Sequence, residues 1–561
     1  MNTSRVAETF DVRRLTAGRG AQIAHGCALL AGFAFLLWMN RNQWYYYDEW
    51  DFLANRGLAG DGRSVWAPHN EHWTTIPILL YLAIGWLVGL GHPLAFALPM
   101  IVAHLVVAHL LWRICLRAGV RTWTATAVTT TFVFLGAGAE NLLWAFQVCF
   151  VGSVAFGLGA LLVVDRPGTD RWAGLLWGWT LATCSLMCSG IGLPMVALIT
   201  VVLFARRDVA RALLFAAVPA VAQGTWYLTY GRHAKSHSGV TARTWVYLDE
   251  FATRGLGYAL ETWLGIAGIG GILIPLLLVV GVSHVARGGT GLTPGILCLG
   301  VFPLFATFAV SRIGIGIDTG IAGRYAYVVV ALALPAVAIA LDRACAAPRM
   351  LSAVLAICAM STWIGMTTLV QQARAGREFE RPGRVTVTSA QVLLDRHERI
   401  LAQALEPVHL YGTPTLRQLI ALNERGRRVN ANWLSDQDLL TSRFFLQTQL
   451  GAAVPGIPVM TVAPQGTTPR TSRSAGCATF ATGRLTGSPN GAGAVELVVA
   501  KPTSIVVELR DRSGRVARKS YPLTAGRQYL TMTARDVDVT IVLPAQPVQV
   551  CGDDGSDVGG R

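Results

Sequence analysis

The sequence predicts a polytopic α-helical membrane protein that carries a soluble carboxy-terminal region. Of its 561 residues, 53% are hydrophobic and only 14% are charged, whereas about a quarter of an ordinary soluble domain is charged. The apolar residues gather in blocks of roughly 16–22 residues, the length that a helix needs to cross a bilayer. These blocks end near residue 370, and the remaining chain is polar and rich in turn-forming residues.

Eleven blocks are candidate membrane spans, and together they predict a membrane domain over residues 21–370 after a cytoplasmic tail of residues 1–20. The first span is expected to be an uncleaved signal anchor, because no convincing small-residue cleavage site follows it. The candidates are residues 21–39, 93–113, 123–138, 148–164, 172–188, 191–205, 209–229, 264–284, 292–310, 325–341 and 349–370.

The distribution of arginines predicts the orientation of these spans. Arginines precede the first span, and Arg113, Arg117 and Arg121 follow the second. Both groups lie on the cytoplasmic side, as basic residues prefer, if residues 75–91 do not cross the membrane. We therefore expect residues 75–91 to form an amphipathic or re-entrant helix on the outer surface. The loop 40–92 and the carboxy-terminal region would then lie outside the cytoplasm.

The carboxy-terminal region is expected to have three parts. Residues 371–450 mix helical and strand-like patterns and predict an extracytoplasmic α/β segment. Residues 451–475 are rich in Pro, Gly, Thr and Ser and are typical of a linker. Residues 476–561 alternate in short strand-like runs, which indicates a small β-sandwich. Cys477 and Cys551 are well placed to form a disulfide there in an oxidising compartment.

The net charge of +15 bears on orientation more than on partners. No basic stripe with interleaved aromatic residues is visible, so we expect no nucleic-acid binding. The sequence lacks the phosphate-binding loop pattern GxxxxGK[ST], so this chain alone is not expected to drive transport with ATP.

Two polar-aromatic clusters occupy the predicted outer loop 40–92. YYYDEWD spans residues 45–51, directly after the first span, and HNEHW spans residues 69–73. Carboxylates and imidazoles are costly at a membrane surface unless they bind or react with something. The alternative is an interfacial belt of aromatic residues beside solvated acids.

The predicted order of elements resembles the GT-C class of membrane glycosyltransferases. This order is one span, an outer loop that begins with an acidic pair, a surface helix, many further spans and an outer tail. The resemblance covers about residues 20–370, and its motif is mainly Asp48-Glu49. The strings DEWDF and HNEHW also resemble uncharacterised bacterial membrane proteins of this type. The resemblance implies an inverting hexosyl- or pentosyltransferase of the bacterial cytoplasmic membrane. Its donor would be a polyprenyl-phosphate-linked sugar, and its acceptor an envelope glycan, glycolipid or protein on the outer face.

In the GT-C class, an acidic residue of the first outer loop acts as general base on the acceptor hydroxyl. The resemblance assigns this role to Asp48, with Glu49 as its neighbour. The chemistry fits, because a sugar hydroxyl is a poor nucleophile until a carboxylate accepts its proton. Two adjacent carboxylates also raise each other's proton affinity.

His69, Glu71 and His72 leave several roles open. The two histidines, at positions i and i+3, would share one face of a helix, but their spacing matches no zinc signature. A divalent cation (Mg, Mn or Ca) held by Asp48 or Glu49 together with His72 is one interpretation. Direct substrate contact and simple ordering of the loop are the others.

Four residues further along the chain complete the candidate site. Arg324 starts the tenth span from the outside, where its guanidinium would clamp a lipid phosphate or merely reach the headgroup layer. Tyr325 lies beside it. Glu140 and Asn141, in the outer loop 139–147, would line the sugar pocket or cap a helix.

Two other functions compete with glycosyl transfer. A polysaccharide or lipid transporter would place polar residues at mid-membrane, and this sequence has few there. A non-catalytic scaffold for envelope assembly would not need Asp48 and Glu49, so replacing them would have no effect on its function.

Overall fold

The computed structural model describes residues 4–60, 62–165, 171–234, 242–345, 348–401, 414–460, 462–465, 470–474, 477–489 and 491–551. The chain forms two compact units. The first comprises Met1–Trp44, Arg63–Ile84 and Pro93–Glu378, and the second comprises Tyr45–Gly62, Gly85–His92 and Phe379–Arg561.

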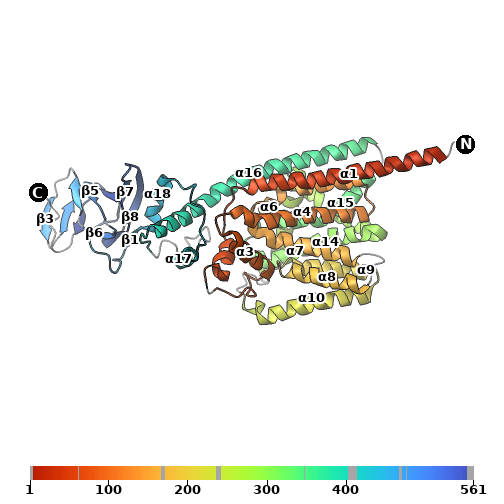
Figure 1. Ribbon diagram of the computed structural model, residues 1–561, viewed down its shortest axis with the longest axis horizontal. Helices are drawn as coiled ribbons and strands as arrows, with labels where there is room; N and C mark the ends of the chain where they lie inside the picture. Colours follow the sequence, from red (N-terminus) through yellow and green to blue (C-terminus); the bar gives the residue numbers. More distant parts are fainter. Residues whose placement is uncertain are drawn as a thin grey trace. The chain divides into compact units, whose positions relative to one another are not determined.

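The first unit is a bundle of helices (Figure 1). Its helices are α1 (Ser4–Asn40), α3 (Thr75–Val88, which ends in the second unit), α4 (Pro93–Arg117), α5 (Thr122–Val133), α6 (Ala139–Leu143), α7 (Val148–Val164), α8 (Arg171–Leu186), α9 (Gly192–Ala205), α10 (Val209–Thr229), α11 (Ala242–Val246), α12 (Leu248–Leu264), α13 (Gly270–Arg287), α14 (Leu292–Arg312), α15 (Gly323–Ala344) and most of α16 (Pro348–Asp395). Short 3-10 turns link some of them: η2 (Gly136–Gly138), η3 (Ala145–Gln147), η4 (Gly231–His233), η5 (Gly289–Gly291) and η6 (Ile317–Ile321).

Helix α15 lies at the centre of this bundle, where it packs against α4, α12 and α14. In its most apolar stretch 78% of the residues are buried, against 22% in α13. The exposed residues of α13 are nevertheless apolar and include Ile272, Leu276 and Val279. Apolar side chains on the outside of a bundle are the pattern expected of helices that face lipid.

Among the described residues, eight helices are long and apolar enough to cross a membrane. All eleven predicted spans overlap helices, but α5 and α9 are short, with 12 and 14 residues, so the number of crossings stays a prediction. One boundary was wrong. The span predicted over 264–284 begins only at Gly270, because α12 ends at Leu264 and Gly265 is left-handed, with φ of 74°.

The segment 75–91 contains α3, a helix of 14 residues. A helix of this length is shorter than the ~20 residues that a span needs. Its predicted place on the outer membrane surface stays a prediction.

The second unit joins the first acidic cluster to the carboxy-terminal region. Its helices are α2 (Glu49–Leu53), the π-turn η1 (Ala54–Leu58), the end of α16, α17 (Leu416–Glu424) and α18 (Asp436–Leu446). Thr415 and Gln418 form a reciprocal capping box that starts α17. Arg427, just after α17, donates to the carbonyl oxygens of Gly85 and Trp86 at 2.9 and 3.1 Å. The tail therefore packs on segments of the outer loop within this unit.

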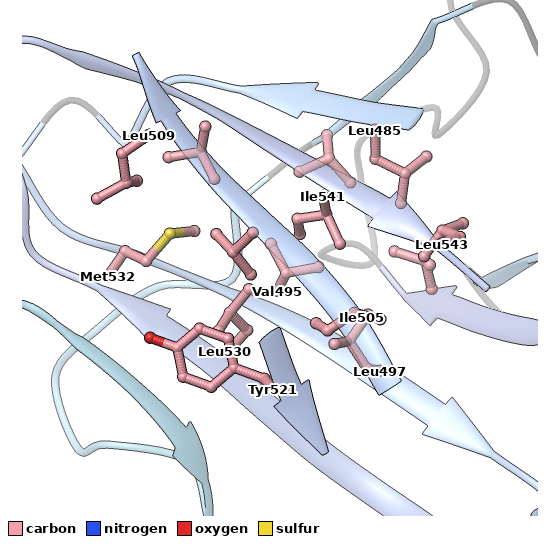
Figure 2. Packing of buried hydrophobic residues seen from close by; sticks show 14 of the residues in the cluster. Leu485, Val495, Leu497, Ile505, Leu509, Tyr521, Leu530, Met532, Ile541 and Leu543 are labelled. Carbon is pink, nitrogen blue, oxygen red and sulfur yellow. The ribbon is translucent and has the colours of Figure 1, made fainter. Parts of the chain in front are cut away.

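Two antiparallel sheets form the rest of the second unit. One has the order β1-β9-β6-β11-β4-β3 and the other β2-β5-β10-β7-β8. Val495 and Leu530 from one sheet and Ile505 and Ile541 from the other meet in a shared apolar core (Figure 2). The strands are β1 (Thr448–Gly451), β2 (Ala463–Gln465), β3 (Arg470–Ser474), β4 (Cys477–Phe480), β5 (Gly483–Gly487), β6 (Gly493–Val499), β7 (Thr503–Asp511), β8 (Val516–Leu523), β9 (Gly526–Met532), β10 (Val537–Leu543) and β11 (Val548–Cys551).

The sandwich begins before the predicted boundary at residue 476. The segment 451–475, which we expected to be a linker, contributes β2 and β3 to the two sheets. Both are edge strands, and Pro464 lies in β2. An edge strand tolerates proline, because it donates to only one neighbour, so a Pro-rich composition did not exclude a strand here.

Cys477 and Cys551 are disulfide-bonded, as the sequence predicts. They face each other across the β4–β11 pair and close a loop with a sequence separation of 74 residues. The bond therefore joins the last strand of the sandwich to an early one.

A buried ion pair joins Glu398 to Arg443 in the second unit. Arg443 Nη2 lies 3.0 Å from Glu398 Oε1, and Gln447 donates to Glu398 Oε2 at 3.0 Å. Burial alone would raise the pKa of Glu398, but the hydrogen bonds from Arg443 and Gln447 outweigh it and hold that pKa below its usual value. Because folding lowers this pKa, ionised Glu398 stabilises the folded state at pH values above about 4.3, the pKa of glutamate in the unfolded chain. That stability is lost as the pH falls through the folded-state value.

We expect Glu398→Gln to weaken the acid dependence of unfolding. The measurement is the apparent Tm of the full-length protein in detergent between pH 7 and pH 3. Asp536→Asn is the matched control, because Asp536 pairs with Arg512 at the exposed surface, where such pairs add little. An equal loss of Tm on acidification in Glu398→Gln and wild type would contradict this account.

Candidate active site

A cavity of about 210 Å³ lies at one end of the helical bundle in the first unit. Aromatic, aliphatic and polar side chains form its wall. The lining residues that matter below are Glu71, His72, Trp73, Phe308, Arg312 and Tyr325.

Arg312 and Tyr325 reach the cavity from two consecutive helices. Arg312 is the last residue of α14 and Tyr325 lies in the first turn of α15. Arg312 Nε donates to Tyr325 Oη at 3.3 Å. The Tyr325 ring stacks on Phe308, one helical turn before Arg312, with 4.2 Å between ring centroids. The aromatic stack thus holds the phenol in place beside the guanidinium.

Glu71 enters the cavity from a tight turn. The backbone N–H groups of His69 and His72 each donate to the carbonyl oxygen of the other, at 3.1 and 2.9 Å. Asn70 has a φ of 51°, a left-handed conformation that asparagine tolerates well. Glu71 Oε1 lies 2.9 Å from Arg312 Nη1, and about four fifths of each side chain is removed from solvent, with 18% and 17% exposed. The contact is therefore a largely desolvated ion pair, and neither Glu71 carboxylate oxygen has a hydrogen-bond partner among the described residues.

His72 lies beside this pair as a neutral group. Its Nε2 is 3.7 Å from Glu71 Oε1. Burial lowers the pKa of His72 to about 4, and Arg312 and Arg324 add to this effect while Glu71 opposes it. The ring packs so closely on Gly190 that a Cβ there would lie 2.8 Å from His72 Nδ1. At neutral pH His72 can donate or accept a hydrogen bond, but it adds no positive charge.

Arg324 forms a second pair with Glu140. Its backbone N–H donates to Glu140 Oε2 at 3.1 Å, and its guanidinium contacts Glu140 Oε1. The guanidinium carbon also lies 5.3 Å from the centroid of the Tyr325 ring. Two arginine–carboxylate pairs therefore flank Tyr325.

Asn141 and His69 are both buried. Asn141 follows Glu140 in the sequence, and His69 lies two residues before Glu71. Asn141 is fully buried, and neither its amide nitrogen nor its oxygen has a hydrogen-bond partner among the described residues. The His69 ring contacts Phe146 at 5.3 Å between centroids. The expectation that His69 and His72 share a helical face was wrong, because the positive φ of Asn70 makes a turn there instead of a helix.

Asp48 and Glu49 belong to the second unit and differ in their surroundings. Glu49 is 2% exposed, and its Oε2 accepts the backbone N–H of Tyr46 at 2.9 Å. Asp48 precedes α2 and is only half-buried. Tyr47, with a φ of 49°, turns the chain before it. Of the two adjacent carboxylates, Asp48 is thus the more accessible.

Asp51 has a structural partner in the same unit. Arg56 Nη2 lies 3.2 Å from Asp51 Oδ2, and Asn55 donates to Asp51 Oδ1 at 2.8 Å. These contacts hold the turn that follows α2.

A divalent cation held by Asp48 or Glu49 together with His72 stays a prediction. Among the described residues, no group of three or more His, Cys, Asp or Glu side chains could hold a metal ion. Glu71, which is not one of the predicted metal ligands, is paired with Arg312.

Arg312 is the residue that the sequence interpretation missed as a site candidate. It follows the apolar stretch of α14 at the end that we expected to lie outside. A basic residue at an outer helix end goes against the positive-inside tendency, and this was the available signal.

Comparisons with known proteins give a distant structural likeness. No protein-family model matches the sequence, and no curated protein matches it. Two crystal structures of ArnT from Cupriavidus metallidurans are similar in fold. The one bound to undecaprenyl phosphate has a TM-score of 0.46 at 15% identity, over 72% of this chain and 88% of that one. The apo structure has a TM-score of 0.47 at 14% identity, over 76% and 91%. This likeness is too distant to carry ligands or residue roles to the present chain.

Proposed function

We propose that this protein is a membrane glycosyltransferase of the GT-C type that uses a polyprenyl-phosphate-linked sugar. The observation that carries the proposal is the cluster of Glu71, Arg312 and Tyr325 around a cavity at the end of an apolar helical bundle. A lipid-linked phosphosugar needs the same combination: an apolar bundle for its chain, a cation for its phosphate and polar-aromatic groups for its sugar.

Arg312 is the proposed phosphate ligand. Its planar guanidinium can bind two phosphate oxygens at once. Glu71 contacts Nη1 of this guanidinium and offsets the cost of a largely buried charge. The donor phosphate would replace or share that contact. Arg324, held by Glu140, would supply further positive charge as the phosphate leaves.

Trp73 and Tyr325 are the proposed sugar contacts. Trp73 stacks on Trp226 with 5.4 Å between centroids, and its Nε1 donates to Thr75 at 2.9 Å. Its orientation is therefore set before any ligand binds, which reduces the entropy lost on binding.

Asp48 is the proposed general base, the role that the resemblance to the GT-C class assigns to it. The acceptor hydroxyl oxygen forms a bond to the anomeric carbon, its proton passes to Asp48, and the bond from that carbon to the phosphate oxygen breaks. Attack from the face opposite the phosphate inverts the anomeric centre. The leaving polyprenyl phosphate needs no proton at neutral pH, so one base is enough. The acceptor is proposed to be an envelope glycan, glycolipid or protein.

We propose that the protein crosses the bacterial cytoplasmic membrane several times, with its tail outside. The basic loops support this orientation, and the Cys477–Cys551 bond suits an oxidising compartment. A membrane-impermeant maleimide should label Lys501→Cys in intact cells, because Lys501 is exposed in the sandwich. Arg287→Cys, at the end of α13, should be labelled only after permeabilisation. Both are made in a Cys27→Ser background, since Cys27 is exposed. The reverse labelling pattern would overturn the orientation.

The activity itself is tested by following a radiolabelled sugar from a panel of polyprenyl-phosphate donors into acceptors in membranes of overexpressing cells. Incorporation above that of membranes lacking the protein, with at least one donor, is the expected result.

A further inference from the structure

A second cavity, of about 590 Å³, is lined by the end of α4 and by the opposite ends of α7, α9, α10 and α14, four helices that also line the first cavity. Its polar lining includes Arg117, Asp165, Arg206, Asp208, Arg211 and Thr293, and the remainder is largely aliphatic, with Ile114, Leu161, Leu162, Leu203 and Pro294.

Helix lengths place the two cavities about one membrane apart. Helix α14 carries Thr293 in its first turn and Arg312 as its last residue. These two positions are about 28 Å apart at a rise of about 1.5 Å per residue. The hydrocarbon core of a bilayer is about 30 Å thick. The second cavity therefore lies at the level of the other headgroup layer and is separate from the proposed active site.

Two of its three arginines already have partners. Arg206 pairs with the carboxylate of Asp165, and its Nη2 donates to Thr293 at 3.0 Å. Thr293 in turn donates to Asp165 Oδ2 at 2.7 Å. Arg117 Nη1 donates to the carbonyl oxygen of Leu162 at 2.6 Å.

Arg211 is different. Its Nε and Nη2 atoms are buried and have no hydrogen-bond partner among the described residues. Asp208 lies one turn away, but one of its oxygens accepts the backbone N–H of Arg211 at 3.1 Å as a helix cap. Buried guanidinium donors without an acceptor are costly. An anion in the cavity would satisfy them.

We propose that this cavity binds the phosphate of an anionic phospholipid headgroup. Arg211 would donate to two phosphate oxygens. The aliphatic wall would accept the first methylenes of the acyl chains. A free phosphate ion is also negatively charged, but it has no apolar part that could contact the aliphatic wall. The wall therefore favours a lipid as the source of the phosphate.

The test uses the full-length protein, purified in detergent and depleted of lipid. Phosphatidylglycerol, phosphatidylcholine and inorganic phosphate are titrated separately, and the shift in apparent Tm reports binding to the folded state. Phosphatidylglycerol should raise the Tm of the wild type at lower concentrations than the other two ligands. In Arg211→Gln its apparent affinity should fall by about tenfold or more, since a charge-assisted contact is lost. Arg207→Gln is the control, because Arg207 is exposed next to Arg206 and outside the cavity lining.

Equal affinity of Arg211→Gln and the wild type for phosphatidylglycerol would overturn the proposal. Equal shifts with phosphatidylcholine and phosphatidylglycerol would also overturn it, and this comparison needs no variant to fold. A shift of the same size with inorganic phosphate would refute the lipid as the source. If Arg211→Gln does not fold, the comparison of phosphatidylglycerol with phosphatidylcholine on the wild-type protein decides the proposal.

Discussion

Asp48→Asn is expected to lower the rate of sugar transfer by about 10²–10⁴-fold, the usual contribution of general-base assistance. The substitution keeps the shape of the side chain and removes its ability to accept a proton. Asp48 makes no side-chain cap bond to α2, so the substitution should not remove a cap from that helix. The measurement is the initial rate of transfer at saturating donor, together with donor binding, which should not change.

Glu49→Gln is the matched control for Asp48→Asn. Glu49 is buried and accepts the Tyr46 N–H, and a glutamine oxygen can accept the same bond. Its rate should stay within a few-fold of the wild type. A large loss in Glu49→Gln with a normal rate in Asp48→Asn would exchange the two roles.

Arg312→Gln is expected to weaken donor binding by about 10–100-fold, because a hydrogen bond to a charged group contributes roughly 1.5–3 kcal/mol. The same change leaves the Glu71 carboxylate without its cation, a cost that is independent of the donor. The double variant Glu71→Gln/Arg312→Gln removes this cost and should recover the stability of the wild type without recovering donor affinity. Arg312→Lys should be intermediate, since it keeps the charge and loses the planar fork.

Arg254→Gln is the control for Arg312→Gln. Arg254 forms exposed pairs with Glu250 and Asp318, so its loss should leave donor affinity unchanged. If Arg312→Gln binds the donor as well as Arg254→Gln does, Arg312 is not a phosphate ligand.

Much of the fold could be predicted from local composition. Apolar blocks, basic loops and the change to alternating strands are all properties of neighbouring residues, and they identified the helical unit and the sandwich. The errors arose where a local pattern had two structural meanings. The glycines after Leu264 were read as part of a span, although Gly265 ends α12. The Pro-rich segment 451–475 was read as a linker, although edge strands also accept proline.

The site was harder to predict, because its central contact is between distant segments. The sequence pointed to Glu71 and Tyr325 separately. It could not show that Arg312 bridges them, since that depends on where α14 ends and how the turn at His69–His72 is shaped. Helical spacing of the two histidines suggested one face, but the left-handed Asn70 made a turn instead. Residue types with chemical function were thus visible in the sequence, while their partners were not.

The most direct test of the central claim is transfer of a radiolabelled sugar from a polyprenyl-phosphate donor by purified wild-type protein, Asp48→Asn and Arg312→Gln in the same liposome preparation. The account predicts transfer by the wild type, a slow rate with normal donor binding in Asp48→Asn, and a raised KM for the donor in Arg312→Gln. Transfer at the wild-type rate and KM by both variants, with a donor that the wild type demonstrably uses, would contradict it.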